Sequence, residues 1–253
     1  MGTVERPFSA RIRSMLDGLT LVLAGMAETL AISVPTVFEA TLGTLTLEAC
    51  DTRLERWSKR LLERAEVRLD VSGLPDLSVA ETFVVMSNHR SLYDVPVLFQ
   101  SFPRTLRMVT KTELFQIPIW GPALRAAGFI EIDRKNRERA IESLRASKAS
   151  LDRGVNVWIA PEGTRSRTPA LGSFKRGGFM LALETGRRIL PVGLAGTERI
   201  IAAGASRIRT GAKVGVRFGE PIDPSDYGMQ RRDALSDAVR ASIAARIAEA
   251  ERP

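Results

Sequence analysis

The pattern of apolar and polar positions changes near residue 66. Beyond it, short apolar runs alternate with longer segments in which apolar positions recur every three or four residues. The short runs predict seven β-strands, at residues 67–71, 83–87, 106–111, 129–133, 155–159, 189–195 and 213–218. Strands that alternate with helices indicate a mixed, mostly parallel sheet flanked by helices, so the predicted fold class is α/β.

Amphipathic helices are expected between these strands. Residues 136–153 keep apolar positions on one face and end at Gly154, a residue suited to a helix C-terminus. Residues 177–186 predict a second helix. A ladder at every fourth position predicts a third: Leu235, Val239, Ile243 and Ile247. No internal repeat or long linker interrupts residues 67–253, so they are expected to form one α/β domain.

The first 66 residues have a different character. Residues 18–27 and 29–38 are uncharged and largely apolar, and single acidic residues interrupt them. A bilayer-spanning helix needs about 20 consecutive apolar residues, and no stretch here reaches that length without an acid. We therefore expect one or two apolar helices between residues 8 and 66, each with a narrow polar stripe.

Acidic residues mark that stripe. Asp17 and Glu28 are eleven positions apart, close to three helical turns, so both lie on one helix face. Pro35 is expected to break the helix before Glu39, which repeats the interval. The helices either insert one face into a membrane interface or form a layer packed on the domain core. We favour insertion, so residues 1–66 are predicted to be a helical membrane-associating segment, followed by the domain.

Composition narrows the class of partner. The 253-residue chain has 37 Lys and Arg against 29 Asp and Glu, and its formal net charge of +8 favours nucleic acid, an anionic bilayer or a phosphorylated molecule. Cys50 is the only cysteine, so no internal disulfide forms and a reducing compartment is expected. One histidine and one cysteine exclude the usual zinc ligand sets. No signal-peptide pattern is present, so secretion is not expected.

The single histidine, His89, lies in the segment Ser-Asn-His-Arg-Ser-Leu-Tyr-Asp, directly after a predicted strand. In α/β sheets, functional side chains gather just beyond strand ends. An imidazole, with an ordinary pKa of about 6.5, takes up a proton at cellular pH, and a carboxylate on its other nitrogen stabilises the resulting cation. Asp94, five positions on, suits that role. It equally suits a helix N-cap, or a capping box with Ser91, and the spacing alone leaves these alternatives open.

A second polar cluster, Ala-Pro-Glu-Gly-Thr-Arg-Ser-Arg-Thr at residues 160–168, also follows a predicted strand. Its arginines, with Lys175 and Arg176 downstream, suit a phosphate because guanidinium groups bind it bidentately. Taken alone, the segment is more simply explained as a solvated basic loop. The patterns of covalent serine hydrolases, Walker nucleotide sites and dinucleotide-binding sites are absent from the sequence.

With a third cluster, these segments resemble one family: the glycerophosphate acyltransferase superfamily, and within it the 1-acylglycerol-3-phosphate acyltransferases. The resemblance covers about residues 83–195, with four motifs in order. His89 and Asp94 match the His-x4-Asp motif. The remaining matches are Lys111, Leu114, Gly121 and Arg134 for the second motif, Glu162 to Ser166 for the third, and Leu190-Pro191-Val192 for the fourth. Glu131 departs from the family, which commonly has an aromatic residue there, and Phe129 is expected to supply the ring.

The resemblance implies a role for each matched residue. His89 is the base, and Asp94 holds and charge-stabilises it. Glu162 braces the neighbouring cations. The implied phosphate-binding residues are Lys111, Arg134, Glu162, Gly163, Thr164 and Arg165. The candidate donors to the tetrahedral oxyanion are Lys111 and the loop amides of Gly163 and Thr164.

The implied reaction is acyl transfer from a thioester, acyl-CoA or acyl-ACP, to the sn-2 hydroxyl of 1-acylglycerol-3-phosphate, giving phosphatidic acid. Neither a metal nor a redox cofactor is expected. A two-helix membrane anchor is also implied, with the protein monotopic or peripheral on the cytoplasmic face of the cell membrane. The alternatives are another acceptor, such as lyso-ornithine lipid or another lysolipid, and a non-catalytic basic protein on membranes or nucleic acid. An aromatic content of 6% argues against nucleic acid.

Overall fold

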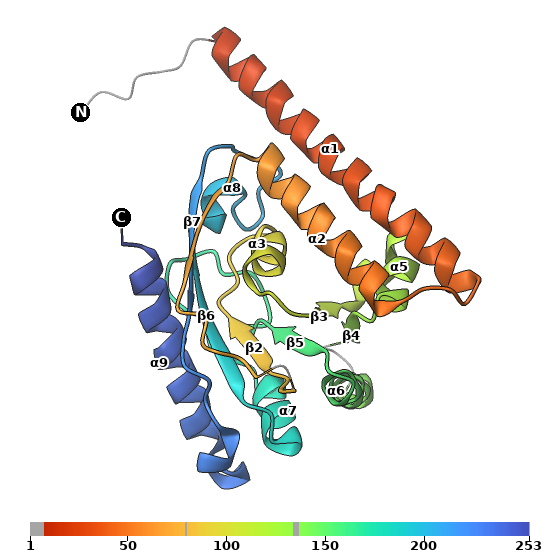
Figure 1. Ribbon diagram of the computed structural model, residues 1–253. Helices are drawn as coiled ribbons and strands as arrows, with labels where there is room; N and C mark the ends of the chain where they lie inside the picture. The colour runs from red at the N-terminus through yellow and green to blue at the C-terminus, as the bar shows by residue number, and fades with distance from the viewer. Residues whose placement is uncertain (1–7, 79, 134–136, 253) are drawn as a thin grey trace.

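The computed structural model describes residues 8–78, 80–133 and 137–252. At its centre lies a seven-stranded sheet with the strand order β1-β7-β6-β2-β5-β3-β4 (Figure 1). The strands are β1 (Arg68–Ser72), β2 (Val84–Ser87), β3 (Leu106–Lys111), β4 (Ile130–Ile132), β5 (Asn156–Ile159), β6 (Ile189–Ala195) and β7 (Lys213–Phe218). Neighbouring strands are parallel except β6 and β7, which are antiparallel. The prediction of a mixed, mostly parallel sheet is confirmed.

Helices cover both faces of the sheet. The helices are α1 (Phe8–Thr41), α2 (Leu47–Arg64), α3 (Asp94–Ser101), α4 (Thr112–Phe115), α5 (Trp120–Ala126), α6 (Arg137–Asp152), α7 (Gly177–Thr185), α8 (Thr197–Ile200) and α9 (Arg232–Ala250). Strand β2 contributes side chains to both helical layers, because successive side chains of a strand point to opposite faces of the sheet. Val85 joins an apolar cluster with residues of α2 and α3, whereas Val84 and Met86 join another with residues of α6, α7 and α9.

The C-terminal helix shows how closely the layers pack. The predicted ladder of α9 is buried: Leu235, Val239, Ile243 and Ile247. Gly193 on β6 has no side chain for a specific reason, since a Cβ there would lie 2.4 Å from the backbone of Arg246 and Ile247. Gly215 on β7 is constrained in the same way by Ala250. These two glycines let the helix backbone lie directly on the sheet.

The expected helix break at Pro35 is wrong, because α1 continues through this residue. A proline inside a helix removes one backbone hydrogen bond. Here α2 holds α1 on both sides of the proline. Trp57 Nε1 donates to Thr29 Oγ1 at 3.1 Å, and Arg53 Nη1 donates to Thr36 Oγ1 at 3.2 Å. Contacts between helices, which local sequence does not reveal, therefore carry the helix past the proline.

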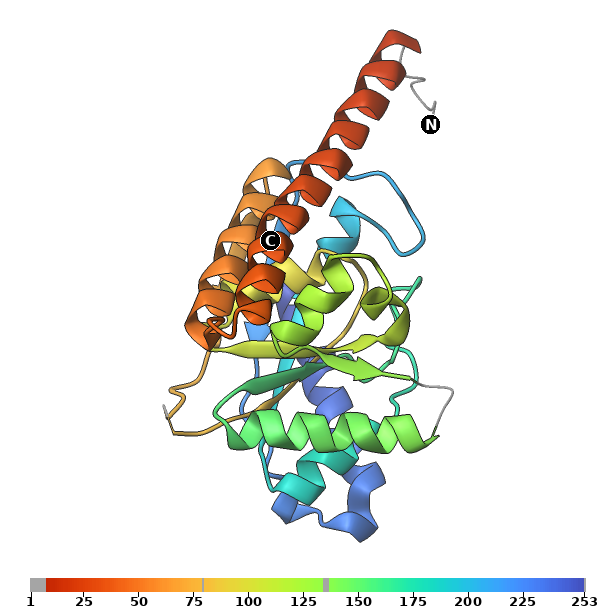
Figure 2. The ribbon, with the colours of Figure 1, turned by 90° about the vertical axis from the view of Figure 1, so that its right-hand side faces the viewer.

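Helix α1 is polar on the side that faces the protein and apolar on the side that faces outward. The buried polar residues Glu28, Ser33 and Thr36 face α2, and Glu28 pairs with Arg60 and Arg64 at 2.9 and 2.7 Å. The outer face of α1 exposes Leu19, Leu23, Met26, Leu30, Val34 and Phe38. Figure 2 shows the N-terminal half of α1 projecting beyond the domain. Gly18–Thr41 is long and apolar enough, by length and composition, to cross a membrane.

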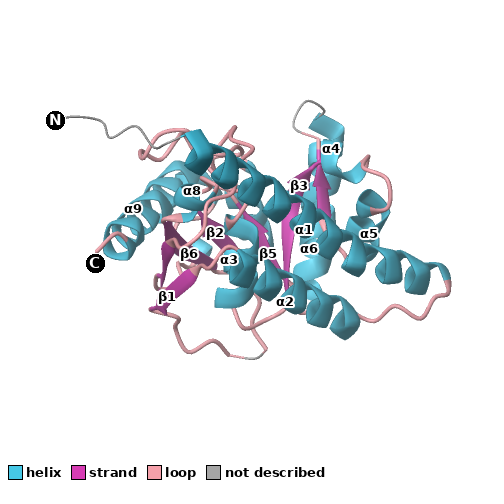
Figure 3. Cartoon of the chain, turned by 90° about the horizontal axis from the view of Figure 1, so that it is seen from above, coloured by secondary structure: helices cyan, strands magenta, loops and turns pink. Residues whose placement is uncertain are grey.

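Helix α2 belongs to the folded domain as much as to α1. It lies beside α1 across the sheet (Figure 3) and packs against α3. Its buried side chains are Cys50, Leu54, Ser58 and Leu62, and Leu62 is part of the main apolar core. A separate two-helix extension is therefore not confirmed, because only α1 presents a largely unburied apolar face. The division of the chain at residue 66 stays a prediction.

Candidate active site

The parallel strands bring the predicted motifs to one edge of the sheet. Strands β2, β5, β3 and β4 are neighbours that run in the same direction, so their C-terminal ends share an edge. The His89 loop follows β2, the segment 160–168 follows β5, and Lys111 ends β3. Arg134 follows β4 and lies outside the described residues. Segments far apart in sequence thus meet around the single histidine.

The histidine and the aspartate form a hydrogen-bonded pair. His89 Nδ1 lies 2.7 Å from Asp94 Oδ2, the Asp94 side chain is fully buried, and the His89 side chain is 19% exposed. Asp94 Oδ2 also accepts from the backbone N–H groups of Arg90 and Ser91, at 2.8 and 2.9 Å. Because the carboxylate accepts a hydrogen bond from Nδ1–H, the neutral ring has its lone pair on Nε2. The N-cap position of α3 is Tyr93, so Asp94 is not the N-cap. The capping-box alternative is met in part, because Asp94 accepts from the Ser91 N–H and Ser91 Oγ accepts from the N–H of Tyr93 at 3.1 Å, and the same carboxylate also holds His89.

Neighbouring side chains fix the loop that carries His89. The Asn88 amide makes two hydrogen bonds of 2.8 Å with the backbone of Leu194 on β6, one in each direction. Ser91 Oγ donates to the carbonyl of Ile201 at 2.8 Å. The first contact reaches β6 itself, and the second reaches the segment just after α8. The imidazole is therefore carried by a loop with little freedom to move.

Trp158 is a site residue that the sequence did not single out. Its indole lies edge-to-face with the imidazole of His89, with ring centroids 5.7 Å apart and an interplanar angle of 89°. Its Nε1–H donates to Ser87 Oγ at 2.9 Å. Trp158 pairs in register with Val85 on the adjacent strand. Its place in the predicted strand, two positions before the 160–168 segment, is the signal in the sequence that could have identified this side chain.

Tyr93 lies beside the pair but does not compete as a base. The residue is buried, and burial raises the pKa of its hydroxyl to about 12. The hydroxyl therefore stays protonated at neutral pH. His89 is left as the proton acceptor of this loop.

Glu162 differs from its expected role. It is buried, and its two carboxylate oxygens accept from backbone N–H groups, Oε1 from His89 at 3.1 Å and Oε2 from Gly172 at 2.8 Å. It thus joins the loops after β2 and β5 instead of bracing cations or presenting itself to a phosphate. The tight turn after β5 causes this, because it directs the side chain beneath the His89 backbone.

Gly163 is also engaged within its own loop. Its φ of +73° is a conformation that glycine adopts readily, and its N–H donates to the carbonyl of Ala160 at 2.9 Å. It is therefore not available as an oxyanion donor. Thr164 is exposed, and Arg165 is half-buried. Neither Arg165 nor the exposed Lys111 side chain has a hydrogen bond or ion pair with any residue that the structure describes, so both cations are available to an anion.

The second motif is built on a tight contact between α4 and α5. A Cβ on Gly121 would lie 2.1 Å from the carbonyl oxygen of Phe115, so only glycine fits. Glu131, the departure from the family pattern, accepts from Arg125 at 3.1 Å. Phe129 faces the apolar side, where its ring lies 6.3 Å from that of Phe99. The aromatic ring at this place therefore belongs to a cavity wall.

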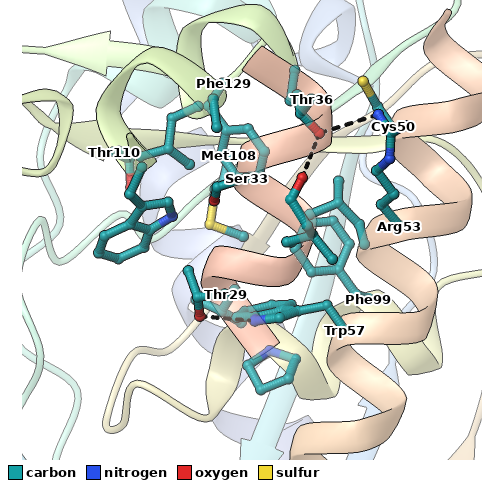
Figure 4. A pocket seen from close by; sticks show the side chains of 18 of the residues that line it. Thr29, Ser33, Thr36, Cys50, Arg53, Trp57, Phe99, Met108, Thr110 and Phe129 are labelled. Atoms are coloured by element: carbon teal, nitrogen blue, oxygen red, sulfur yellow. Dashed lines mark hydrogen bonds between the residues drawn. The ribbon is translucent and has the colours of Figure 1, made fainter. Parts of the chain in front are cut away.

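An apolar cavity of about 250 Å³ lies between α1, α2, α3, α5 and β3 (Figure 4). Leu92 and Tyr93, from the His89 loop, line it. Its walls include Trp57, Phe99, Met108, Leu114, Trp120 and Phe129. Polar groups reach it chiefly from α1, and Figure 4 shows Thr29 bonded to Trp57 and Thr36 bonded to Arg53. The cavity can hold apolar groups, and Leu92 and Tyr93 join its wall to the loop that carries His89.

Known proteins resemble this chain along most of its length. The model of the family described as Acyltransferase matches residues 68–195. The chloroplastic 1-acyl-sn-glycerol-3-phosphate acyltransferase LPAT1 of Arabidopsis thaliana is 33% identical over 70% of this chain and 48% of its own length. The alpha form of that enzyme from Mus musculus is 30% identical over 70% of this chain and 62% of its own. The chain thus spans about half to two thirds of the length of these curated relatives.

A solved structure matches nearly the whole chain. The crystal structure of the 1-acyl-sn-glycerophosphate (LPA) acyltransferase PlsC from Thermotoga maritima superposes with a TM-score of 0.78 at 25% sequence identity. The match covers 96% of this chain and 99% of that one. The likeness therefore extends over α1 and α2 as well as over the sheet.

Proposed function

Because the chain belongs to the acyltransferase family, we propose that it transfers an acyl group from a thioester to the sn-2 hydroxyl of 1-acylglycerol-3-phosphate, giving phosphatidic acid. The relatives named for this activity support the choice of acceptor. The observation that carries the proposal is the 2.7 Å contact between His89 and Asp94 beside an apolar cavity. The loop that carries the base also contributes Leu92 and Tyr93 to the wall of an apolar cavity.

The base acts through Nε2 of His89. As the acceptor hydroxyl attacks the thioester carbonyl, Nε2 takes its proton, and Asp94 stabilises the imidazolium through Nδ1. When the tetrahedral intermediate collapses, the C–S bond breaks, the ester C–O bond remains, and the proton passes to the leaving thiolate. The chemistry needs neither a metal nor a redox cofactor, because a thioester is already an activated acyl group.

Cationic side chains and one backbone amide are proposed to stabilise the negative charges of this reaction. Lys111 and the backbone amide of Thr164 are the candidates to stabilise the oxyanion, since the Gly163 amide already donates to Ala160. Arg165 binds the phosphate of the acceptor, and Arg134 is proposed to assist from the end of β4. The absence of other partners for Lys111 and Arg165 among the described residues supports these roles.

The membrane supplies the lipid. The outer face of α1 is apolar from Leu19 to Phe38, and the proposed acceptor and product both reside in a bilayer. We propose that α1 lies in the interface of the cytoplasmic membrane face, with the chain monotopic or peripheral. The cavity then receives one acyl chain, and the donor, acyl-CoA or acyl-ACP, approaches from the water.

Competition between acceptors tests the proposal. Detergent-dispersed 1-acylglycerol-3-phosphate, lyso-ornithine lipid and lysophosphatidylcholine are offered with matched acyl-CoA and acyl-ACP donors, and products are identified by mass spectrometry. We expect phosphatidic acid to form fastest with at least one donor, with the new ester at sn-2. Faster acylation of lyso-ornithine lipid would assign the same chemistry to that acceptor, and consumption of no thioester would end the enzyme assignment.

A further inference from the structure

The turn between α4 and α5 exposes apolar side chains. This turn, residues 116–120, has the sequence Gln-Ile-Pro-Ile-Trp, and Ile117 and Ile119 are 38% and 44% exposed. No charged residue occurs between Glu113 and Arg125. An isoleucine pair at the tip of an uncharged turn is an unfavourable choice for a surface that meets only water.

The backbone of this turn is strained. Ile119 has φ +66° and ψ −53°, and the N–H of Trp120 donates to the carbonyl of Pro118 at 2.7 Å. This is a γ-turn of the rarer class, with positive φ at its centre. A β-branched residue is disfavoured at positive φ, where glycine is free of strain. The sequence therefore keeps an isoleucine at the position where folding alone favours glycine.

The surrounding contacts hold the turn in this conformation. The N–H of Gly121 donates to the carbonyl of Ile117 at 2.8 Å, and Arg125 Nη1 donates to the carbonyl of Phe115 at 3.0 Å. Phe115 is buried and anchors α4. Strain of this kind persists where the neighbouring structure over-determines it and where it serves a function. Its effect here is to leave Ile119 exposed while Trp120, the next residue, lines the cavity.

The turn is joined to α1 through α5. Helix α5, which begins at Trp120, packs against α1, and residues of both helices line the cavity. Figures 1 and 2 both place α5 beside the C-terminal half of α1. Leu92, in the His89 loop, lines the same cavity and is 53% exposed. Residues of α1, the end of the turn and the His89 loop therefore share one apolar cavity.

We propose that the turn of residues 116–120 is a second membrane-contacting element beside α1. Ile117 and Ile119 enter the bilayer interface and hold the rim of the cavity against the lipid, so that an acyl chain passes from bilayer to cavity without crossing water. A lipid surface is the partner that fits, because the turn is uncharged and is joined through α5 to α1, whose outer face is apolar. The inference rests on the proposed lipid acyl transfer and extends it to a named surface.

The variant Ile119→Gly separates this role from a structural one. Glycine relieves the strain, so we expect a Tm equal to or above that of the wild type. Loss of the apolar side chain should lower partition onto vesicles of phosphatidylethanolamine and phosphatidylglycerol about tenfold. Transfer to acceptor embedded in those vesicles should fall by a similar factor, while transfer to detergent-dispersed acceptor stays within about twofold. A turn that served the fold alone would show none of these losses.

Met229 provides a matched control. It is 52% exposed in the short helical turn Met229–Arg231, just before α9. The N-terminal end of α9 lies away from α1 (Figure 1). We expect Met229→Ser to leave vesicle partition unchanged, and a loss equal to that of Ile119→Gly would overturn the inference. Unchanged partition of Ile119→Gly would also overturn it, as would a change confined to self-association of the chain. A wild type that binds vesicles but acylates no lysophosphatidate would defeat the proposed function, and the partition measurements would still decide the role of the turn.

Discussion

At the scale of single residues, Asp94 ties the histidine to the backbone of its own loop. One carboxylate oxygen, Oδ2, accepts from His89 Nδ1 and from the N–H groups of Arg90 and Ser91. The imidazole orientation and the loop conformation are therefore set by the same atom. A change at Asp94 disturbs both.

Replacing the base should remove the activity. We expect His89→Ala to lower kcat by about 10²–10⁴-fold while the circular dichroism spectrum is unchanged, because a positioned general base contributes that much. Asp94→Asn should also lower kcat strongly, since a neutral amide does not stabilise the charge of the imidazolium and can turn its NH₂ group toward the ring. Initial rates with detergent-dispersed acceptor measure both effects. Retention of more than about a tenth of wild-type kcat by His89→Ala would remove the base assignment.

Trp158 should act as a positioning residue through His89. Trp158→Phe keeps an aromatic ring beside the imidazole and should lose less than about threefold in kcat. Trp158→Leu removes the ring, and we expect about tenfold loss in kcat with KM unchanged, because the imidazole is less well positioned. Equal losses in both variants, or a loss carried by KM, would reduce Trp158 to a packing residue.

Arg165 should distinguish acceptors by their phosphate. Charge-assisted hydrogen bonds contribute about 1.5–3 kcal/mol, so Arg165→Ala should lower kcat/KM for the phosphorylated acceptor by roughly 10–150-fold. Arg134→Ala is expected to behave alike. An acceptor without phosphate should lose far less, and Arg167→Ala, an exposed arginine of the same segment, serves as the control. Equal losses for both acceptors would make these residues structural, or place the donor there.

Sequence spacing predicted which residues gather at the site better than it predicted what their backbone does. The motif order predicted that His89, Asp94 and Lys111 follow strands of one sheet edge, and parallel strands bring these segments to that edge. The hydrogen bonds of Glu162 and Gly163 were not visible in the sequence. They depend on the φ values and direction of one short turn, which residue types do not determine.

At the scale of elements, the two N-terminal helices have different partners. Helix α1 contacts the protein through a polar stripe, whereas α2 places Leu62 in the main core. The sequence predicted apolar helices here but not this difference. The predicted helix break at Pro35 is wrong for a related reason. Hydrogen bonds from Arg53 and Trp57 of α2 hold α1 on both sides of the proline, and contacts between helices are not visible in local sequence.

Truncation should distinguish the contributions of α1 and α2 to the stability of the domain. We expect a chain that begins near Thr44 to unfold cooperatively in a thermal scan, because α2 and the core remain complete. A chain that begins near Val67 should lose cooperative unfolding, because it exposes α3 and the apolar surface that Leu54 and Leu62 cover. Cooperative unfolding of the shorter chain would show that α2 is dispensable for the core.

At the scale of the whole molecule, charge and apolar surface act together. A net charge of +8 attracts anionic headgroups, and each Lys or Arg near the surface contributes about 1 kcal/mol. We expect the full chain to sediment with anionic vesicles, and added salt to weaken this binding only in part, because the outer face of α1 remains. Complete release by salt would mean that the attachment is electrostatic alone.

The loop hydrogen bonds also determine which contacts of the site survive substitution of the neighbouring residues. Asn88, Asp94 and Glu162 hold the site through backbone groups of Leu194, Arg90, Ser91, His89 and Gly172. A backbone N–H is present whatever the side chain, with proline as the exception. The hydrogen bonds at Leu194 and Arg90 therefore do not depend on the side chains at these positions, whose identity is set by packing, since both are buried. Acceptor preference can diverge around a reaction centre that stays the same.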